Sequence, residues 1–230
     1  MSDIQLVVFD MAGTTVRDTG NVAKAFTDAF HAFNIDVPLT TVNQVMGFRK
    51  IDAIRMLLPG GNSLLPEQIH EAFTRNMLAW YQNDPELQPL PEVEAVFLLL
   101  KQRGIKIALN TGFTRAVTNA ILQRLQWNVP QTIDMVVCSD EVPEGRPQPF
   151  MIETIMKQLG VSDSKAVVKV GDTKVDVEEG RNAACGLVVS VTTGAYSRSE
   201  LEAYRPDFII DSLAGLPALL DSLSELETRI

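Results

Sequence analysis

The chain has 230 residues, of which 46% are hydrophobic and 21% charged, a composition typical of a folded globular protein and not of a disordered one. Its formal net charge of -9 disfavours nucleic acid as a partner, because phosphate backbones attract basic surfaces, but it leaves room for a small phosphorylated substrate in a local basic pocket. No hydrophobic run has the length of a membrane span and the N-terminus lacks a secretion-signal pattern, so we expect no membrane contact and a cytoplasmic location.

The cysteines and histidines do not form a recognisable disulfide or metal pattern. Cys138 and Cys185 both lie in apolar surroundings, which favours small core residues over a disulfide pair. His31 and His70 are far from each other and from the cysteines along the chain, so zinc chemistry is not expected.

The chain opens with an apolar run that ends in a carboxylate. Leu6–Phe9 predicts a fully buried strand, and Asp10 follows it directly, ahead of a Gly-Thr-Thr turn. At the carboxyl edge of a parallel sheet an aspartate can be a metal ligand or a nucleophile, although aspartate also caps ordinary turns. A second apolar run, residues 166–170, also ends in a turn with Asp172 and Asp176. Two strands that deliver carboxylates to one edge favour a functional site.

Residues 17–89 have the period of helices. Apolar residues recur there at spacings of three and four, and no convincing strand interrupts them. A Pro-Gly-Gly-Asn-Ser stretch at 59–63 breaks the block, and prolines at 85, 89 and 91 close it. We therefore predict a small all-helical insertion at residues 17–89. Its apolar stripes are Val22, Ala25, Phe26, Ala29, Phe30 and Phe33, then Ile51, Ile54, Leu57 and Leu58, then Ile69, Phe73, Met77 and Trp80.

From residue 90 onward, helices alternate with strands. This alternation predicts the α/β class, with a doubly wound parallel sheet and right-handed crossovers, and the opening strand belongs to the same sheet. The expected core is therefore discontinuous and consists of residues 1–16 and 90–230. The expected strands are 105–109, 135–138, 166–170, 187–191 and 208–210, and the expected helices are 93–103, 116–125, 150–159 and 213–226.

Four polar segments meet at one edge of this predicted sheet. They are residues 10–14, residues 110–112, the loop 144–147, and Asp172 with Asp176. Thr111 and the N–H groups beside it are suited to an anion, and Arg146 supplies a planar fork of donors for a phosphoryl group. Each segment alone is more typical of a turn or a solvated loop.

Taken in order, these segments resemble the haloacid dehalogenase superfamily. Its four motifs appear as Asp10-Met11-Ala12-Gly13-Thr14, Thr111-Gly112, Arg146, and Gly171-Asp172-Thr173 to Asp176, each in the expected strand context. The resemblance covers the whole chain. It implies a doubly wound core with an all-helical cap inserted after the first motif.

The resemblance also implies a role for each motif residue. Asp10 would attack phosphorus and form an aspartyl-phosphate. Asp10, the backbone carbonyl of Ala12 and Asp172 would hold Mg2+. Thr14 and Asp176 would lie behind these ligands. The residues that would bind the substrate or its phosphoryl group are Gly47, Thr111, Gly112 and Arg146.

Ala12 departs from the usual pattern of the superfamily. Its phosphatases usually carry an aspartate at this position, which protonates the departing alcohol and later activates water. Alanine does neither. Another residue must therefore assist the departure of the leaving group.

Lys50 is the candidate for that help. It lies in Met46-Gly47-Phe48-Arg49-Lys50-Ile51-Asp52, in the first turn of a predicted helix, where the helix dipole and Arg49 favour the neutral amine. The spacing alone favours an exposed surface lysine. Together with Asp-x-Ala-Gly-Thr and Glu-Gly-Arg-Asn-Ala at 179–183, the segment resembles the phosphonatase family, in which a cap lysine forms a Schiff base with the substrate aldehyde. The resemblance implies Mg2+-dependent cleavage of the C–P bond of phosphonoacetaldehyde or another 2-oxoalkylphosphonate, with Asp10, Lys50 and Arg146 as catalytic residues.

Two features depart from the phosphonatase pattern, and alternatives stay open. Ala53 stands where the family often has histidine, and the segment between 193 and 211 is short. A phosphatase for a small phosphomonoester is favoured if Lys50 only contacts a negative group. A non-catalytic phosphometabolite-binding protein is disfavoured because the nucleophile, metal ligand and arginine are all retained. A haloacid dehalogenase would not need the Gly-Asp-Thr metal site. The apolar face of Phe26, Phe30 and Phe33 suits either a homodimer contact or packing within the chain.

Overall fold

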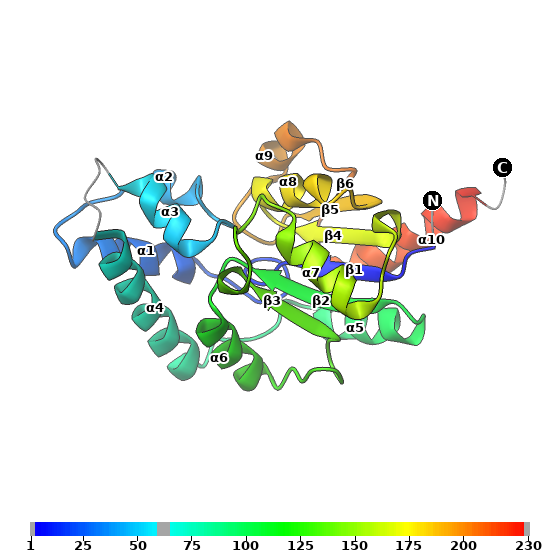
Figure 1. Ribbon diagram of the computed structural model, residues 1–230, viewed down its shortest axis with the longest axis horizontal. Helices are drawn as coiled ribbons and strands as arrows, with labels where there is room; N and C mark the ends of the chain where they lie inside the picture. The colour runs from blue at the N-terminus through cyan, green and yellow to red at the C-terminus, as the bar shows by residue number, and fades with distance from the viewer. Residues whose placement is uncertain (1–2, 59–64, 228–230) are drawn as a thin grey trace.

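The computed structural model describes residues 3–58 and 65–227, and the predicted break at 59–63 lies outside the described residues. In this part of the chain, six parallel strands form one sheet in the order β3-β2-β1-β4-β5-β6 (Figure 1). The strands are β1 (Leu6–Phe9), β2 (Lys106–Thr111), β3 (Met135–Cys138), β4 (Val167–Gly171), β5 (Leu187–Val191) and β6 (Phe208–Ile210). The prediction of a doubly wound parallel sheet is confirmed, with β1 in its interior.

Two strands end later than predicted. The pairing of β2 with β3 continues through Asn110 and Thr111, which lie opposite Val137 and Cys138. Likewise, β4 includes Gly171, which pairs with β5. Asn110 and Thr111 are therefore held by the sheet itself and not by a loop.

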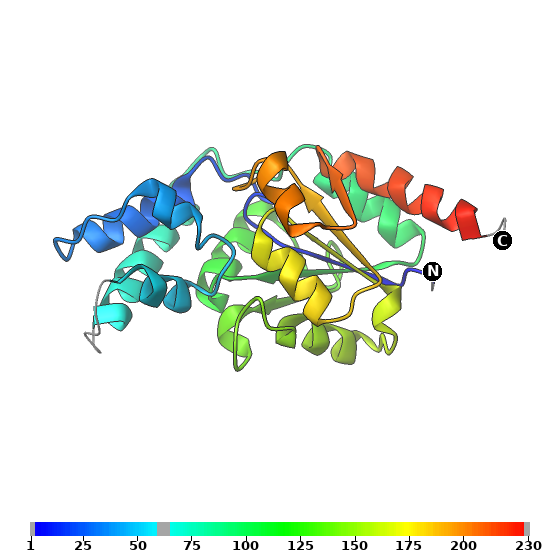
Figure 2. The same cartoon turned by 90° about the horizontal axis from the view of Figure 1, so that it is seen from above.

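Both faces of the sheet are buried, which explains why its strands are apolar throughout. In β1, Val7 and Phe9 belong to one hydrophobic cluster, and Leu6 and Val8 belong to the other. Helices α5 and α10 cover the first face, and α7 and α8 cover the second (Figure 2). Their bounds, with that of α6, are α5 (Val93–Gln102), α6 (Arg115–Leu125), α7 (Phe150–Leu159), α8 (Lys174–Asn182) and α10 (Leu216–Glu227).

Three helices are additions to the sequence-based expectation: α2 (Leu39–Asn43), α8 and α9 (Arg198–Tyr204). Helix α8 is rich in charged residues, so it lacks the long apolar stripe by which the other helices are found. A signal for α8 and α9 does exist, because each begins with a capping box, formed by Thr173 with Asp176 and by Ser197 with Glu200.

The closing helix begins later than predicted. Leu213–Gly215 forms a 3-10 turn, and the α-helix begins at Leu216. Pro217 has no N–H to donate to the carbonyl of Leu213, so the α-helical pattern cannot extend back across it. Other 3-10 turns lie at Ser139–Glu141 and Ser164–Ala166.

Four helices lie together at one end of the molecule, away from α10 (Figure 1). They are α1 (Asn21–His31), α2, α3 (Lys50–Leu57) and α4 (Leu65–Asn83), and the described part of residues 17–89 forms no strand beyond an isolated bridge. Helix α1 packs against α4 through Phe26 and Phe73, whose ring centroids are 4.6 Å apart. Phe26 and Phe30 are fully buried there. The apolar face considered for a homodimer is therefore used within the chain.

Two adjacent segments connect this helical block to the rest of the chain. The N–H of Arg17 donates to the carbonyl of Gln88 at 3.1 Å, and the N–H of Leu90 donates to the carbonyl of Thr15 at 3.0 Å. Because the first segment follows β1 closely, the block is held against the carboxyl edge of the sheet.

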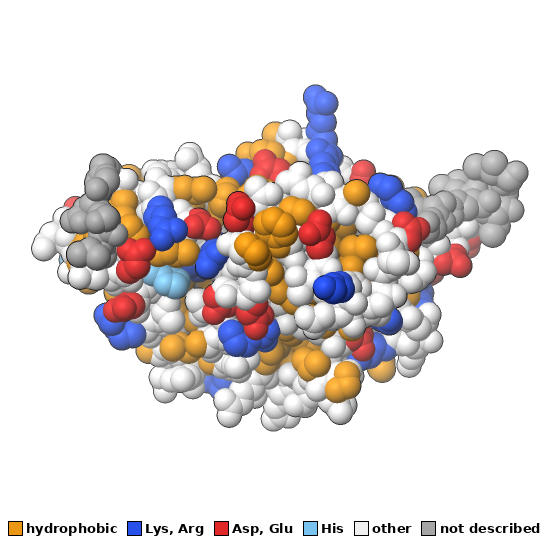
Figure 3. All heavy atoms as spheres, in the orientation of Figure 1, with side chains coloured by type: hydrophobic (Ala, Val, Ile, Leu, Met, Phe, Trp, Pro, Cys, Tyr) orange, Lys and Arg blue, Asp and Glu red, His pale blue; other side chains and the backbone are white. Residues whose placement is uncertain are grey.

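The remaining surface features agree with the composition. Acidic and basic side chains are interspersed over the face in Figure 3. None of the described helices combines the length and hydropathy needed to cross a bilayer. Cys138 and Cys185 are unpaired and buried, which confirms them as small core residues.

Candidate active site

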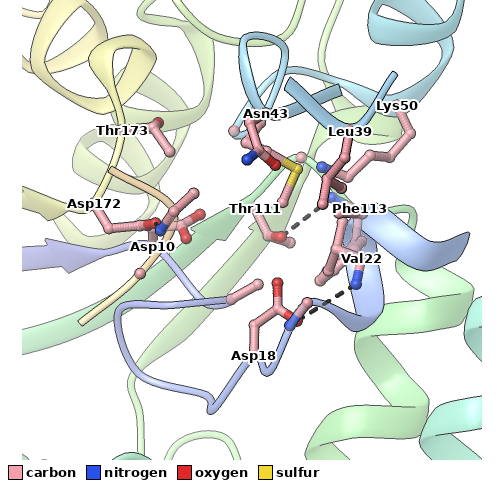
Figure 4. A pocket seen from close by; sticks show the side chains of 18 residues that line it. Asp10, Asp18, Val22, Leu39, Asn43, Lys50, Thr111, Phe113, Asp172 and Thr173 are labelled. Atoms are coloured by element: carbon pink, nitrogen blue, oxygen red, sulfur yellow. Dashed lines mark hydrogen bonds between the residues drawn. The ribbon is translucent and has the colours of Figure 1, made fainter. Parts of the chain in front are cut away.

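A cavity of about 280 Å3 lies where the carboxyl ends of β1, β2 and β4 face the helical block. Asp10, Thr111 and Asp172 line it from the sheet edge, and Asp18, Asn43 and Lys50 line it from the other side. Figure 4 shows Asp10 and Asp172 side by side, with Lys50 across the pocket from them. The structure thus brings together the first, second and fourth predicted motifs and the lysine.

Asp10 is held at the end of β1 by both the backbone and its side chain. Its N–H donates to the carbonyl of Val170 at 2.9 Å, so the ladder with β4 extends up to it. Its Oδ1 accepts from Arg146 Nη2 at 2.6 Å. Burial, with a further contribution from Asp176, raises the pKa of Asp10, and Arg146 opposes this rise. The carboxylate is therefore a fixed and poorly solvated group.

Asp172 is fixed by two donors on opposite sides. Thr14 Oγ1 donates to its Oδ1 at 3.0 Å, and the N–H of Ala195 donates to its Oδ2 at 2.7 Å. Gly194 lies so close that a Cβ at its position would collide with this carboxylate. Burial raises the pKa of Asp172 well above its usual value, and the neighbouring Asp10 adds to the rise. Two carboxylates thus share one buried space.

Arg146 lies behind Asp10 and does not line the cavity. Its side chain is fully buried, and Nη1 donates to Asp176 Oδ1 at 2.5 Å while Nη2 donates to Asp10. Although burial alone lowers its pKa, Asp176 and Asp10 more than compensate and raise it. The sequence predicts that the Arg146 guanidinium is free to bind a phosphoryl group. In the structure, two of its nitrogens instead donate to the carboxylates of Asp176 and Asp10.

A second buried cation supports this arrangement. Lys169 on β4 is fully buried, and its Nζ lies 3.0 Å from Asp176 Oδ1 and 3.2 Å from Glu179 Oε2. Asn110 joins them, because its amide donates to Glu179 at 2.8 Å and its Oδ1 accepts from Lys169 at 2.7 Å. Arg146 and Lys169 together outweigh the effect of burial and lower the pKa of Asp176. Asp176 is thus a bridge between the two cations.

The buried charges do not balance. In the described residues, four carboxylates and three cations are buried; the carboxylates are Asp10, Asp172, Asp176 and Glu179, and the cations are Lys50, Arg146 and Lys169. If all four carboxylates are ionised, one negative charge lacks a partner when Lys50 is protonated and two lack one when it is neutral, and burial of unpaired charge is costly. A bound cation would offset this excess.

Glycines allow the helical block to approach the sheet edge closely. A Cβ on Gly112 would collide with the carbonyl oxygen of Phe48. Gly47 has a φ of +85°, and a Cβ there would collide with Thr173 and Val175. The segment just before α3 therefore rests directly on two loops of the sheet edge.

This contact places Lys50, the first residue of α3, inside the pocket. Only 5% of Lys50 is exposed, and its Nζ lies 3.3 Å from the carbonyl oxygen of Phe48. The Nζ is also 5.1 Å from the ring centroid of Phe113 and 5.7 Å from that of Phe26. The alternative of an exposed surface lysine is therefore wrong, because the docking of α3 on the sheet edge encloses the side chain.

Burial, followed by the charge of Arg146, lowers the pKa of Lys50 to about 8. The neighbouring Arg49 points elsewhere, since its Nη1 donates to the carbonyl of Pro143 at 3.2 Å. The lowered pKa predicted from the sequence is supported, but its main cause is burial and not Arg49.

Several residues of the site were missed in the sequence. Asp18 and Asn43 line the cavity but belong to no motif used above. Lys169 and Glu179 lie below the pocket. The sequence does contain a signal for Lys169, because a lysine inside an apolar strand is expected to pair with a buried carboxylate. Ala53 is fully buried and has no place in the cavity lining.

Comparisons with known proteins agree with this geometry. A family model described as haloacid dehalogenase-like hydrolase matches residues 7–190. A phosphonoacetaldehyde hydrolase of Bordetella pertussis is 32% identical, and the match covers 99% of this chain and 94% of that protein. A solved hydrolase from Pseudomonas syringae superposes with a TM-score of 0.85 at 19% identity, covering 95% of this chain and 98% of that one. A phosphonoacetaldehyde hydrolase-like protein from Oleispira antarctica superposes with a TM-score of 0.81 at 23% identity, covering 97% and 94%. The chain therefore belongs to the haloacid dehalogenase-like hydrolases and is an enzyme of their phosphonatase-like type.

Proposed function

We propose that this enzyme is a Mg2+-dependent hydrolase that cleaves the C–P bond of phosphonoacetaldehyde or a related 2-oxoalkylphosphonate. The observation that carries the proposal is the position of Lys50, a buried amine with a pKa of about 8 that lines the same cavity as Asp10 and Asp172. A plain phosphatase has no use for a neutral amine opposite its nucleophile. It needs a leaving-group acid, and Ala12 cannot supply one.

In this proposal, Lys50 attacks the carbonyl carbon of the substrate and forms an iminium ion with loss of water. The positive iminium nitrogen withdraws electrons from the C–P bond, so carbon departs as an enamine and needs no proton from position 12. The rings of Phe26 and Phe113 help to bury Nζ, and the effect of burial on the neutral amine outweighs the attraction of the ring faces for the ammonium ion.

Asp10 would be the nucleophile that receives the phosphoryl group as an aspartyl-phosphate. Its backbone N–H, bonded within the sheet, fixes the direction from which the carboxylate approaches phosphorus. Thr111 and Gly112 line the cavity beside it and would bind phosphoryl oxygens. An arriving phosphoryl oxygen would also take over the Arg146 donor that Asp10 holds in this structure.

The residues present fit a magnesium ion. Among the described residues no three His, Cys, Asp or Glu side chains are grouped as a metal site, so two carboxylates would be completed by other oxygens, such as a backbone carbonyl and water. Asp10, Asp172 and the carbonyl of Ala12 would hold the ion, with Thr14 orienting Asp172 and Gly47 shaping the opposite wall. When bound, Mg2+ would neutralise the paired carboxylates and the charge that develops on the phosphoryl oxygens.

The helical block would act as the cap of the site. We assign residues 17–89 to this cap and residues 1–16 and 90–230 to the core. The two adjacent segments around Arg17 and Gln88 would be the link between them. Closure of α3 on the sheet edge would enclose Lys50 together with the substrate.

The test is a product assay with purified enzyme, Mg2+ and phosphonoacetaldehyde, in which phosphate and acetaldehyde are measured together. The proposal predicts equal amounts of both products and loss of both in Asp10→Asn. A panel of small phosphomonoesters is the comparison. Release of phosphate from the esters but not from phosphonoacetaldehyde would favour the phosphatase instead.

A further inference from the structure

We propose that Asp18 is the catalytic acid–base that carries protons during imine formation at Lys50; this inference rests on the function proposed above. The overall change is the reaction of the Lys50 ammonium with the substrate carbonyl to give an iminium ion and water. Two protons must leave the nitrogen and reach the carbonyl oxygen, while one stays on nitrogen. A buried site needs a side chain that accepts and returns these protons.

The described lining of the cavity offers few such groups. Its titratable side chains are Asp10, Asp18, Lys50 and Asp172. In the proposed reaction Asp10 attacks phosphorus. Asp172 lies beside it and accepts hydrogen bonds from Thr14 and from the N–H of Ala195. His70, on α4, does not line the cavity. Asp18 therefore remains as a carboxylate without another task in the reaction.

The backbone fixes Asp18 with one oxygen and leaves the other for the pocket. Oδ1 accepts from the N–H groups of Gly20 at 3.0 Å and Asn21 at 2.8 Å, the N-cap residue and the first residue of α1. Figure 4 shows the second carboxylate oxygen turned toward the middle of the cavity, below Thr111. A carboxylate held in this way keeps a defined direction toward a substrate carbonyl that lies against Lys50.

Asp18 also acts on Lys50 through its charge. The charged groups that influence Lys50 come from four segments: Asp10 after β1, Asp18 before α1, Arg146 before α7 and Asp172 after β4. Asp18 opposes the lowering of the Lys50 pKa by burial and by Arg146. The two side chains thus face the same small space from the helical block.

The steps balance as follows. The amine lone pair of neutral Lys50 forms the C–N bond while the carbonyl π pair moves to oxygen. Asp18 takes a proton from nitrogen and passes it to this oxygen, which gives the carbinolamine. Asp18 then takes up, through solvent, the proton that the Lys50 ammonium released when it became neutral. Protonated Asp18 then donates to the hydroxyl group, the C–O bond breaks, and water leaves as the nitrogen lone pair forms the C=N bond. Asp18 returns to its carboxylate form.

The test separates this role from the hydrogen bonds that Asp18 accepts at the start of α1. Asp18→Asn keeps a side-chain oxygen that can accept from the N–H groups of Gly20 and Asn21, but it removes the acid–base group. Asp28→Asn is the matched control, since Asp28 lies on α1 and pairs at the surface with Lys24. The measurement is the rate at which saturating borohydride traps phosphonoacetaldehyde on Lys50 across a pH series, with the thermal unfolding midpoint of each variant.

We expect Asp18→Asn to lower the trapping rate about 100-fold or more at every pH, with its unfolding midpoint kept within about 2 °C. Asp28→Asn should trap at the wild-type rate. Asp18→Gly, which leaves space for a small carboxylate, should regain part of its rate when formate is added as an external acid–base. The role of Asp18 would be overturned, without affecting the proposed function, by either of two results. One is a trapping rate in Asp18→Asn within about threefold of wild type. The other is a pH–rate profile of Asp18→Asn that is shifted along the pH axis but reaches the wild-type plateau. Absence of trapping in the wild-type enzyme would overturn the proposed function itself.

Discussion

Burial decides how much of the Lys50 amine is free to react. An ordinary lysine with a pKa of 10.5 is neutral in about 0.03% of molecules at pH 7, whereas a pKa of about 8 gives about 10%. We therefore predict that the rate of imine formation rises tenfold per pH unit below about pH 7.5 and levels off above about pH 8.5. Borohydride trapping at fixed substrate concentration measures this profile.

A simple alkylamine in solution provides the control for that profile. Its imine formation with the same aldehyde should keep increasing with pH beyond 9, because an unperturbed amine of the lysine type has a pKa of about 10.4. A Lys50 profile that rises in the same way would contradict the lowered pKa.

Lys169, the buried lysine below the pocket, supports a prediction about the stability of the fold. Lys169→Met leaves Asp176 and Glu179 buried without one of their partners, and removal of one member of a buried ion pair costs about 3–5 kcal/mol. We expect the free energy of unfolding in urea to fall by that amount. Adding Glu179→Gln to Lys169→Met should recover part of the loss, because it removes one unpaired charge. A loss below about 1 kcal/mol in the single variant would show that Lys169 does not stabilise this network.

At the scale of elements, the contact between the α3 start and the sheet edge is the feature that creates the pocket. Gly112→Ala would push the carbonyl of Phe48 away, and a displacement of about 1 Å at a reacting group can cost 100-fold in rate. We predict a fall in kcat of this order with little change in the unfolding midpoint. Gly215→Ala is the control, since a Cβ there would meet Ile210 at an ordinary 3.7 Å. Unchanged kcat in Gly112→Ala would contradict the importance of this contact.

The sequence predicted the strands well because both of their faces are buried and their apolar runs have clear ends. It placed Asp10 and Asp172 at the sheet edge for the same reason, since each follows a strand directly. It could not predict that Lys50 is buried, because that depends on how α3 docks against loops far along the chain. The commitment of Arg146 to Asp10 and Asp176 has the same origin, since its partners are 136 and 30 residues away.

Helix α8 shows the other limit of sequence patterns. Its buried residues include Asp176 and Glu179, which a periodicity argument counts as solvent-exposed. They are buried because Arg146 and Lys169 neutralise them, and such pairing between segments is invisible to a local pattern.

At the scale of the whole molecule, the excess of buried negative charge predicts stabilisation by metal. An ion that binds only the folded state stabilises it by about 2.7 kcal/mol at 100 times its dissociation constant. We expect Mg2+ to raise the thermal unfolding midpoint of the wild-type protein, and chelator to reverse the change. Asp172→Asn should abolish this response. Asp211→Asn, an exposed position paired with Arg198, should keep it. A Mg2+ response of equal size in Asp172→Asn would place the metal elsewhere.

The most direct measurement is the mass spectrum of the enzyme after turnover of phosphonoacetaldehyde in the presence of borohydride. We predict an added ethyl or phosphonoethyl group on the peptide that contains Lys50, permanent loss of activity, and neither effect in Lys50→Arg, because a guanidinium group keeps the charge but cannot form an imine. An unmodified Lys50 in inactivated or active enzyme, together with substantial turnover by Lys50→Arg, would contradict covalent catalysis by this lysine.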